Sequence, residues 1–315
     1  SVQKYRKKFE DTWRVKKFIS EELKNQELEL SSGLDFALFS QTKPLKSPNI
    51  IAVQLLLKAP FKIRTTYSTV KENISNVSKK RLNKFLQAKL TRVNLRYDNV
   101  IVPKYTTLDI IKKRDPNDIY RLKSMMKEAI ANVVGGIGYY WGKIKIQFDE
   151  KPEKGRYIQG FRYALEDKGL LSASPSRSFF ARGFLWDEGF HNIIISQFNY
   201  NITIDIIDSW LSTMSATGYI AREQIRGAEQ EAQVGSQFVV QDKLIANPPT
   251  FIFPVTSIIN FYKYQSEEKD LRLVHNFLKK VYDKFSSWYE WYEFYQKSSS
   301  GDRQSASSNM FYSWQ

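Results

Sequence analysis

Cysteine is absent from this sequence of 315 residues, and histidine occurs only twice, as His191 and His275. The absence of cysteine excludes disulfide bonds, thiolate metal sites and a cysteine nucleophile. Two histidines do not support a histidine-based metal site, so we expect neither a metal nor a cofactor. No apolar run approaches the ~18 residues that are needed to span a bilayer, so this segment is not predicted to cross a membrane.

Acidic residues are scarce in the first half of the chain. Residues 1–150 hold 30 Lys and Arg against 15 Asp and Glu, whereas residues 151–315 hold 18 of each. The basic excess favours nucleic acid or an anionic membrane surface as a partner. However, aromatic side chains that could stack on bases are sparse in the most basic stretch, and no nucleic-acid-binding motif is present. We therefore expect no nucleic-acid partner; the basic-surface interpretation stays open as one that predicts tight, strongly salt-dependent binding.

Aromatic residues are abundant, with 18 Tyr, 21 Phe and 7 Trp. With a hydrophobic fraction of 42%, the chain can bury a substantial core, which predicts one large domain or two ordinary ones. The aromatic content suits a groove that binds carbohydrate or peptide, and it suits an ordinary helical core equally well.

The first two zones of the chain differ in pattern from the rest. Residues 1–70 contain β-rich runs, among them "NIIAVQLLLKAPFKIRTTYSTV", which predicts two strands separated at Ala59-Pro60. The opening "YRKKFEDTWRVKKF" fits either an amphipathic helix or an exposed pair of strands. Residues 71–117 are basic and include "KKRLNKFLQAKLTRVNL", which has helical spacing, so we interpret them as a linker between domains.

Residues 118–315 carry strong helical signals. A helix is predicted to start near Asp115 and to run through "IYRLKSMMKEAIANVV", ending where the glycines of "GGIGYYWG" supply positive φ angles. Further helices are predicted in "GFHNIIISQF", "TIDIIDSWLSTM", "TFIFPVTSIINFYKY" and from Lys269 to Tyr295. Strands do not alternate with these helices, so we expect an all-α domain of paired helices rather than a parallel α/β sheet.

Polar clusters lie in the loops between the predicted helices, where binding residues are commonly found. The loops are "SRSFFARGFLWDEGFH", "GYIAREQIRGAEQEA", "QDKLIANPPTF" and "GGIGYYWG". Their planar polar groups and aromatic rings include Arg182, Trp186, Asp187, Glu188, Arg222, Glu223, Gln224 and Asn247. Vicinal sugar hydroxyls pair with carboxylates, guanidinium groups and amides, and the C–H face of a pyranose packs on an aromatic ring. The loops therefore favour a sugar site.

Asp187 and Glu188 are adjacent, and neighbouring side chains point in different directions on a helix or a strand. They do not by themselves form the pair of carboxyl groups that flanks a glycosidic bond during hydrolysis. The "WDEG" stretch also fits a helix N-terminus, where the helix dipole favours acidic side chains. His191 is expected to pack on a helix or to support other residues rather than to act in catalysis.

These loops and "QFVVQ", in this order and spacing, resemble the processing glucosidases of glycoside hydrolase family 63. The resemblance is close from about Leu122 to Tyr262 and looser upstream. It implies a mainly α fold in three parts. Residues 1–70 would end an N-terminal β-sandwich domain, residues 71–117 would form a basic linker, and residues 118–315 would form the N-terminal half of an (α/α)6 toroid.

The resemblance implies an inverting glycoside hydrolase of the mannosyl-oligosaccharide glucosidase type. Such an enzyme removes the terminal α-1,2-linked glucose from a triglucosylated, high-mannose N-glycan precursor on nascent glycoproteins. It implies the lumen of the endoplasmic reticulum, with a membrane anchor upstream of this segment. Possible glycosylation sequons at Asn73, Asn76 and Asn201 are compatible with a lumenal protein.

The resemblance also implies which side chains bind the glucose. They are Phe180, Arg182, Trp186, Asp187, Glu188, Arg222, Glu223 and Asn247. "WDEGFH" would begin an inner helix of the toroid and point its polar groups into the sugar pocket. In the family, the general acid lies in a "SGLDDYPR"-like motif after "NPP", and the general base follows later. The catalytic residues are therefore unknown here and expected beyond Gln315, and Asp35 in "SSGLDFALF" is interpreted as a coincidence.

An alternative to the enzyme stays open at the level of the sequence. A protein without the general acid and base would be a non-catalytic glycan-binding or scaffold derivative of the family. It would bind glucosylated glycans without hydrolysing them, and this segment alone would also be inactive.

Overall fold

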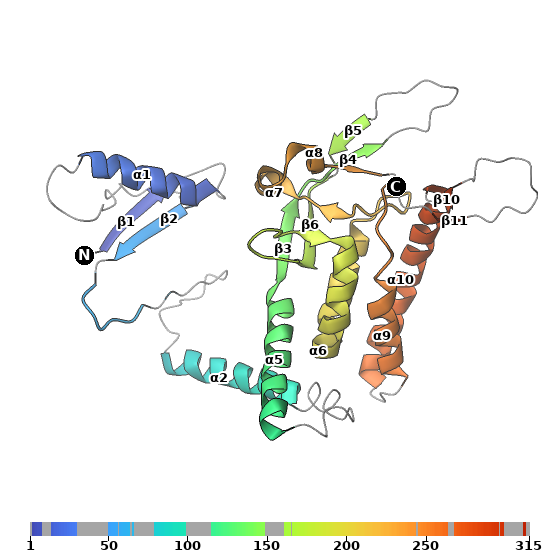
Figure 1. Cartoon of the computed structure of the whole chain (residues 1–315), viewed down its shortest axis with the longest axis horizontal. Coiled ribbons are helices and arrows are strands. Elements are labelled where there is room, and N and C mark those ends of the chain that lie inside the picture. The colour runs from blue at the N-terminus through green and yellow to red at the C-terminus, as the bar shows by residue number, and fades with distance from the viewer. Residues whose placement is uncertain are drawn as a thin grey trace, which may run out of the picture. The chain divides into compact units, whose positions relative to one another are not determined.

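The structure is a computed structural model in which the chain divides into two compact units, Ser1–Asn83 and Lys84–Gln315 (Figure 1). The described residues are 2–7, 14–29, 50–55, 57–63, 65, 79–98, 115–148, 161–164, 166–243, 245–263, 268–295, 297–298 and 311–312. Asp35, Asn73 and Asn76 lie outside them. All eight side chains expected to bind glucose belong to the second unit.

The first unit contains a strand pair and a helix. Strand β1 (Val2–Lys7) pairs antiparallel with strand β2 (Ile50–Leu55), and helix α1 (Val15–Glu29) lies between them in sequence. The opening stretch "YRKKFEDTWRVKKF" is predicted to form either a helix or a pair of strands. Its first residues belong to the strand β1 and its last residues to the helix α1. The first predicted β-rich run is confirmed as β2, whereas residues 61–63, in the second run, are not a strand.

Helices α2 and α5 form where the sequence predicts them. α2 (Lys79–Arg96) covers the basic stretch with helical spacing. α5 (Pro116–Gly135) starts at a proline, and the Asp115 carboxylate caps it by accepting the backbone N–H of Asn117 at 2.7 Å. The expected mode of ending is wrong, because Gly136 has a φ of −79° and neither glycine at this end has a positive φ. The chain instead continues directly into a strand.

Short strands occupy the connections between the helices of the second unit. β3 (Ile137–Gly142) pairs antiparallel with β6 (Lys168–Ala173). β4 (Lys145–Phe148) lies between antiparallel β5 (Phe161–Ala164) and parallel β9 (Val240–Asp242). The unit is mainly helical, as expected, but the expectation of an all-α domain missed these pairs. Pairing satisfies backbone N–H and C=O groups that buried loops would leave open.

Three longer helices complete the second unit. They are α6 (Leu185–Ser212), α9 (Ile252–Tyr262) and α10 (Glu268–Tyr295), and α9 packs along α6 (Figure 1). α6 joins two helical stretches that the sequence predicts separately, and its backbone leaves helical geometry at Asn199, with φ −158° and ψ 100°. The predictions of α9 and α10 are confirmed.

Smaller elements lie around these helices. Two short helices, α7 (Gly227–Gln233) and α8 (Ser236–Val239), precede β9. After α10, strand β10 (Lys297–Ser298) pairs antiparallel with β11 (Phe311–Tyr312). Within the ranges that the structure describes, no helix combines the length and the apolar character needed to cross a bilayer.

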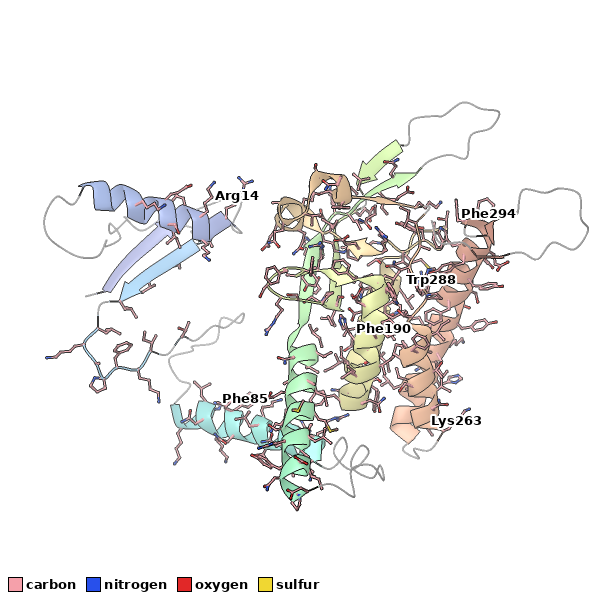
Figure 2. All side chains as sticks on the ribbon, viewed as in Figure 1. Arg14, Phe85, Phe190, Lys263, Trp288 and Phe294 are labelled. Atoms are coloured by element: carbon pink, nitrogen blue, oxygen red, sulfur yellow. The ribbon has the colours of Figure 1, made fainter. Side chains whose placement is uncertain are left out.

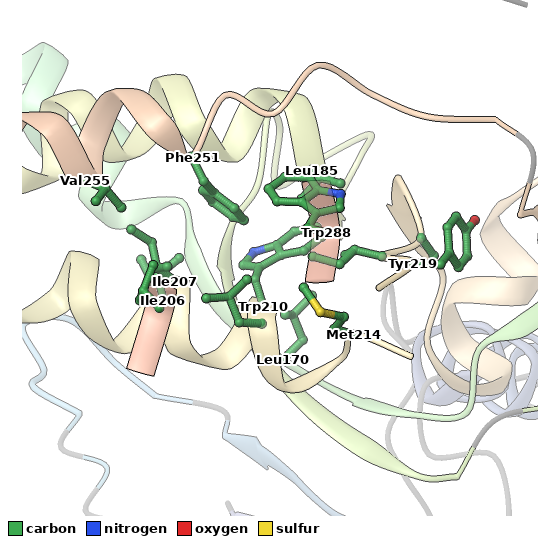
Figure 3. Close-up of a cluster of buried hydrophobic side chains, with 14 of the residues drawn as sticks. Leu170, Leu185, Ile206, Ile207, Trp210, Met214, Tyr219, Phe251, Val255 and Trp288 are labelled. Carbon is green, nitrogen blue, oxygen red and sulfur yellow. The ribbon is translucent and has the colours of Figure 1, made fainter. Parts of the chain in front are cut away.

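The core of the second unit combines aliphatic side chains with large aromatic ones that join its helices (Figure 3). Trp210 of α6, Phe251 just before α9 and Trp288 of α10 are buried. The ring centroid of Phe251 lies 6.0 Å from that of Trp210 and 6.2 Å from that of Trp288. Burial of each large apolar side chain contributes roughly 1.5–3 kcal/mol, so this cluster holds the three helices together. Leu185, the first residue of α6, belongs to the same core, which holds the "WDEG" end of the helix against it.

Candidate functional site

Two of the polar loops meet as a strand pair at the start of α6. β7 (Gly183–Phe184) and β8 (Glu223–Gln224) pair antiparallel. The backbone N–H of Leu185 then donates to the carbonyl oxygen of Arg222 at 2.8 Å. The motifs "RGFLWDEG" and "AREQ", which are far apart in sequence, therefore lie side by side.

Arg182 is buried beside this strand pair, with 6% of its surface exposed. Its Nη2 and Nε atoms both lie 2.5 Å from Oε1 of Glu223. The rings of Phe180 and Phe184 have their centroids 5.8 and 5.1 Å from the central carbon of the guanidinium group. A charge-assisted hydrogen bond and two aromatic rings thus hold the guanidinium group in one orientation.

One nitrogen of the Arg182 guanidinium group takes no part in the pair with Glu223. Its Nη1 atom is buried and has no hydrogen-bond partner among the residues that the structure describes. Only Oε1 of the Glu223 carboxylate takes part in the pair with Arg182. A buried donor without a partner costs about 1–3 kcal/mol, so it is a candidate group for binding a polar ligand.

The first turn of α6 presents three consecutive side chains to different surroundings. Trp186 is 48% exposed, Asp187 is half-buried, and Glu188 is fully buried. Successive residues of a helix are rotated by about 100°, which separates the two carboxylates as the sequence predicts. Within the described parts of the chain, the Asp187 carboxylate makes no hydrogen bond or ion pair. It is therefore open to a ligand, whereas Glu188 is not exposed to one.

Glu188 is bonded to the strand β6 and to its own helix. Its Oε2 accepts the hydroxyl of Ser172 at 2.6 Å. Its Oε1 accepts the backbone N–H of Ala173 at 3.1 Å and the amide of Asn192 at 2.7 Å. His191 is half-buried; its Nδ1 lies 3.7 Å from Oε2 and makes no hydrogen bond with the residues that the structure describes. The Glu188 carboxylate is thus part of the protein interior.

The charge of Glu188 also acts on a neighbouring phenol. Burial raises the pKa of Tyr140 above its usual value, and the negative charge of Glu188 adds to the rise, while a hydrogen bond with Ser174 opposes it. Tyr140 belongs to β3, so the effect reaches across the sheet formed by β3 and β6. Through Tyr140, the "GGIGYYWG" motif therefore interacts electrostatically with Glu188 in the first turn of α6.

The "ANPPTF" loop also reaches the start of α6. The hydroxyl of Thr250 donates to the carbonyl oxygen of Trp186 at 2.7 Å. Gly189 lies so close to this loop that a Cβ atom there would come within 2.2 Å of Oγ1 of Thr250. Asn247 is half-buried; its backbone carbonyl accepts the hydroxyl of Tyr292, and its amide reaches only the carbonyl of Ala246, at 3.4 Å.

Gln241, in the last position of "QFVVQ", supports the strand β8. Its Oε1 accepts the backbone N–H of Glu223 at 3.2 Å, and its amide donates to the carbonyl of Phe238 at 3.0 Å. The end of "GGIGYYWG" is held against the same region, because Gly142, with φ of +141°, would place a Cβ atom 2.6 Å from the backbone nitrogen of Gly227. The motifs named from the sequence thus converge on one end of the second unit.

An aromatic strip borders the polar groups on α6 and α9. Phe190, labelled in Figure 2, has its ring centroid 6.4 Å from that of Trp186 and 6.0 Å from that of Phe253. All three rings are about half exposed. Charged and amide groups next to exposed rings are the combination that the sequence analysis associates with sugars.

The structure brings most of the expected residues together, but in different roles. Phe180, Arg182 and Glu223 form one contact group, and Trp186 and Asp187 follow in the first turn of α6, directly after the strand β7 that pairs with β8. Arg222 joins through its backbone carbonyl, and its side chain is exposed. No described contact links the Asn247 side chain to Arg182, Asp187 or Glu223.

Sequence reasoning missed several residues that hold this region together. They are Ser172, Gln230, Gln241 and Thr250. Gln230, Gln241 and Thr250 belong to motifs that the sequence singles out, so a signal for them existed. Ser172 stands in an unremarkable strand and gives no signal before its bond to Glu188 is seen.

Comparison with known proteins decides the family. Residues 77–315 match the model for the glycosyl hydrolase family 63 C-terminal domain. The chain belongs to glycosyl hydrolase family 63. The resemblance carried by the loops is thereby confirmed, and the site described above is a region of a glycoside hydrolase family domain.

Individual members of family 63 are similar over much of this chain. A mannosyl-oligosaccharide glucosidase of Arabidopsis thaliana is 34% identical over 80% of the chain and 29% of its own length. A protein of the same plant named alpha-glucosidase 2 is 31% identical over 72% of the chain and 27% of its own length. A mannosyl-oligosaccharide glucosidase of Saccharomyces cerevisiae is 28% identical over 65% of the chain and 24% of its own length. The chain spans less than a third of each of these relatives.

Proposed function

We propose that this chain is the glucose-binding part of a mannosyl-oligosaccharide glucosidase. The proposed reaction is removal of the terminal α-1,2-linked glucose from the triglucosylated N-glycan precursor, with inversion, in the lumen of the endoplasmic reticulum. The names of the family 63 relatives support the substrate class. The upstream membrane anchor, the β-sandwich ending in residues 1–70, the linker of residues 71–117 and the (α/α)6 toroid beginning in residues 118–315 are parts of the same proposal.

The pair of Arg182 and Glu223 carries the proposal. The guanidinium group is buried and fixed, and its Nη1 atom has no partner among the described residues. A glucose hydroxyl that accepts from Nη1 would remove the cost of the open donor, and Oε2 of Glu223 could accept from a neighbouring hydroxyl. Asp187 would supply a second carboxylate, and the exposed ring of Trp186 would pack on the pyranose face.

The proposed role of this chain is recognition rather than proton transfer. Inverting hydrolysis needs an acid and a base roughly 6.5–9.5 Å apart, on opposite sides of one bond. Asp187 and Glu188 do not form such a pair, because Glu188 is fully buried and bonded within the protein. We propose that the general acid and general base come from outside residues 1–315. The residues of this chain would hold the glucose while those groups act on its glycosidic oxygen.

The test is Asp187→Asn in the full-length native protein. We expect the affinity for the glucose-shaped iminosugar deoxynojirimycin to fall about 100-fold, because a charged hydrogen bond to a ligand is lost. Asp205→Asn is the matched control, since Asp205 is exposed on the same helix beyond its break. Calorimetric titration measures both variants, and unchanged affinity in Asp187→Asn contradicts the proposal.

The reaction is tested separately with a triglucosylated oligosaccharide. Release of one glucose, with the anomeric configuration inverted as seen by NMR, is the expected result. Binding of the oligosaccharide without release of glucose would identify the protein as a non-catalytic derivative of the family.

A further inference from the structure

We infer that Glu188 is a positioning residue: its buried carboxylate fixes the first turn of α6 on β6 and so sets the places of Trp186 and Asp187. The inference rests on the proposed glucose site. It changes the role that the sequence gave to Glu188, from contact with the sugar to support of the side chains that contact it.

Burial and bonding separate Glu188 from any ligand. None of its surface is exposed, and both of its carboxylate oxygens accept hydrogen bonds. The donors are the hydroxyl of Ser172 and the backbone N–H of Ala173, both on β6, and the amide of Asn192 on α6. A fully buried group whose two oxygens are both hydrogen-bonded within the protein acts on the ligand only through the backbone that it holds.

The first turn of α6 depends on such outside contacts. Phe184 occupies the N-cap position and provides no side-chain hydrogen bond to the free N–H groups of the turn. The turn is held instead by the Glu188 carboxylate on β6, by the bond from Leu185 to Arg222, and by the bond from Thr250 to Trp186. Glu188 is the residue of α6 that contributes a side chain to these contacts, because Leu185 and Trp186 take part through backbone atoms.

Ser172 extends the anchor to the far half of α6. Its hydroxyl oxygen accepts the indole N–H of Trp210 at 3.2 Å while its hydroxyl proton reaches Glu188. Asn199, where the helical geometry breaks, lies between Glu188 and Trp210 along α6. One serine of β6 therefore ties both halves of the broken helix to the same strand.

Glu188→Gln separates positioning from direct action of the charge. The Gln oxygen can keep the bonds from Ala173 and Asn192, and its amide can donate to Oγ of Ser172. The Ser172 proton then turns to the carbonyl oxygen of Ala173, which already lies 2.8 Å from Oγ. We expect Glu188→Gln to bind deoxynojirimycin within about threefold of the wild type, because the anchor survives without the charge.

Ser172→Ala weakens the anchor without touching Glu188 or the proposed sugar contacts. It removes the donor to Oε2 of Glu188 and the acceptor of Trp210. We expect amide hydrogen exchange across residues 185–192 to become about fivefold faster, and affinity for deoxynojirimycin to fall by a similar factor, since the first turn of α6 loses one of its hydrogen bonds to β6. Ser174→Ala is the matched control, because Ser174 is also buried, follows β6 directly and donates to Gly136 instead of Glu188.

The experiments use the full-length native protein and read exchange and affinity in parallel. Equal exchange across residues 185–192 in the two serine variants would overturn the inference. Loss of affinity in Glu188→Gln as large as that in Asp187→Asn would also overturn it, because the charge itself would then act on the sugar. Hydrogen exchange needs no ligand, so a wild-type protein that fails to bind deoxynojirimycin refutes the proposed function while the positioning role is still decided by exchange.

Discussion

Two buried polar clusters lie at the start of α6, and they differ in how their central charged groups are paired. Around Glu188, both carboxylate oxygens accept hydrogen bonds from the protein. Around Arg182, Nη1 has no partner among the described residues, although the same guanidinium group is paired with Glu223. An open buried donor costs about 1–3 kcal/mol. Buried atoms without a described partner occur in both clusters, because Oδ1 of Asn192 and Nδ1 of His191 lie beside Glu188. What distinguishes Arg182 is that its open donor belongs to a guanidinium group packed against aromatic rings and paired with only one oxygen of Glu223.

The largest expected change in the free energy of unfolding comes from replacing a tryptophan of the core. The matching substitution in the exposed aromatic strip of Trp186, Phe190 and Phe253 should change it far less. Trp288→Ala should lower the free energy of unfolding by about 3–5 kcal/mol, because the buried ring contacts Phe251 in the core. Trp186→Ala should change it by less than about 1 kcal/mol, because half of that ring is exposed. The same Trp186 variant should bind deoxynojirimycin about tenfold more weakly.

Urea unfolding and calorimetric titration measure these two quantities. If Trp186→Ala destabilises the protein as much as Trp288→Ala does and leaves affinity unchanged, the strip belongs to the core and the division between the two regions is wrong.

A smaller effect is expected where the "ANPPTF" loop meets α6. Gly189→Ala should lower the free energy of unfolding by about 1–3 kcal/mol, because the new methyl group would overlap Thr250. Gly135→Ala, at the end of α5, is the control; no atom lies within 4 Å of the added Cβ atom. In the absence of a clash, Ala in place of Gly in a helix is neutral or stabilising by up to about 1 kcal/mol. Equal effects of the two substitutions on thermal unfolding would argue against the close contact.

The smallest expected effect is on how the free energy of unfolding depends on pH. It concerns Tyr292 of α10, whose hydroxyl donates to the backbone carbonyl of Asn247. Burial raises the pKa of Tyr292 above its usual value of 10.0, so the folded protein keeps the phenolic proton more tightly than the unfolded chain does. The resulting stability is fully present below about pH 10 and is lost as the pH rises through the folded pKa.

Tyr292→Phe removes this titration and also the hydrogen bond to Asn247, which costs about 1 kcal/mol at neutral pH. Between pH 9 and pH 11, we therefore expect the free energy of unfolding to fall less steeply in Tyr292→Phe than in the wild type. Parallel profiles in urea unfolding would show that Tyr292 does not contribute to the pH dependence.

Local signals explain which parts of the fold the sequence predicts. The Asp115 cap and the following proline mark the start of α5, and apolar periodicity marks α10. The strand pairs β3–β6 and β4–β9 join segments that are distant in sequence, and their short runs carry no clear alternation of polar and apolar residues. Pairing of this kind depends on tertiary contacts, so single-sequence patterns miss it.

In the candidate site, the sequence likewise indicates which residues take part but not which contacts each of them makes. Residue types and motif order indicate a sugar site and the residues around it, including Arg182 and Glu223, whose contact is observed. The sequence does not show that Asp187 stays open while its neighbour Glu188 turns inward to Ser172. That difference depends on which face of α6 meets β6, and this is set by the packing of the core.

The most direct test of the central claim is a pair of titrations with deoxynojirimycin, on Arg182→Lys and Glu188→Gln in the full-length native protein. Lys keeps the positive charge for Glu223 but cannot supply the open Nη1 donor, whereas Gln keeps the bonds that hold α6 on β6. We predict a loss of about 100-fold in affinity for Arg182→Lys and a change within about threefold for Glu188→Gln. Equal losses in the two variants, or a larger loss for Glu188→Gln, would contradict it.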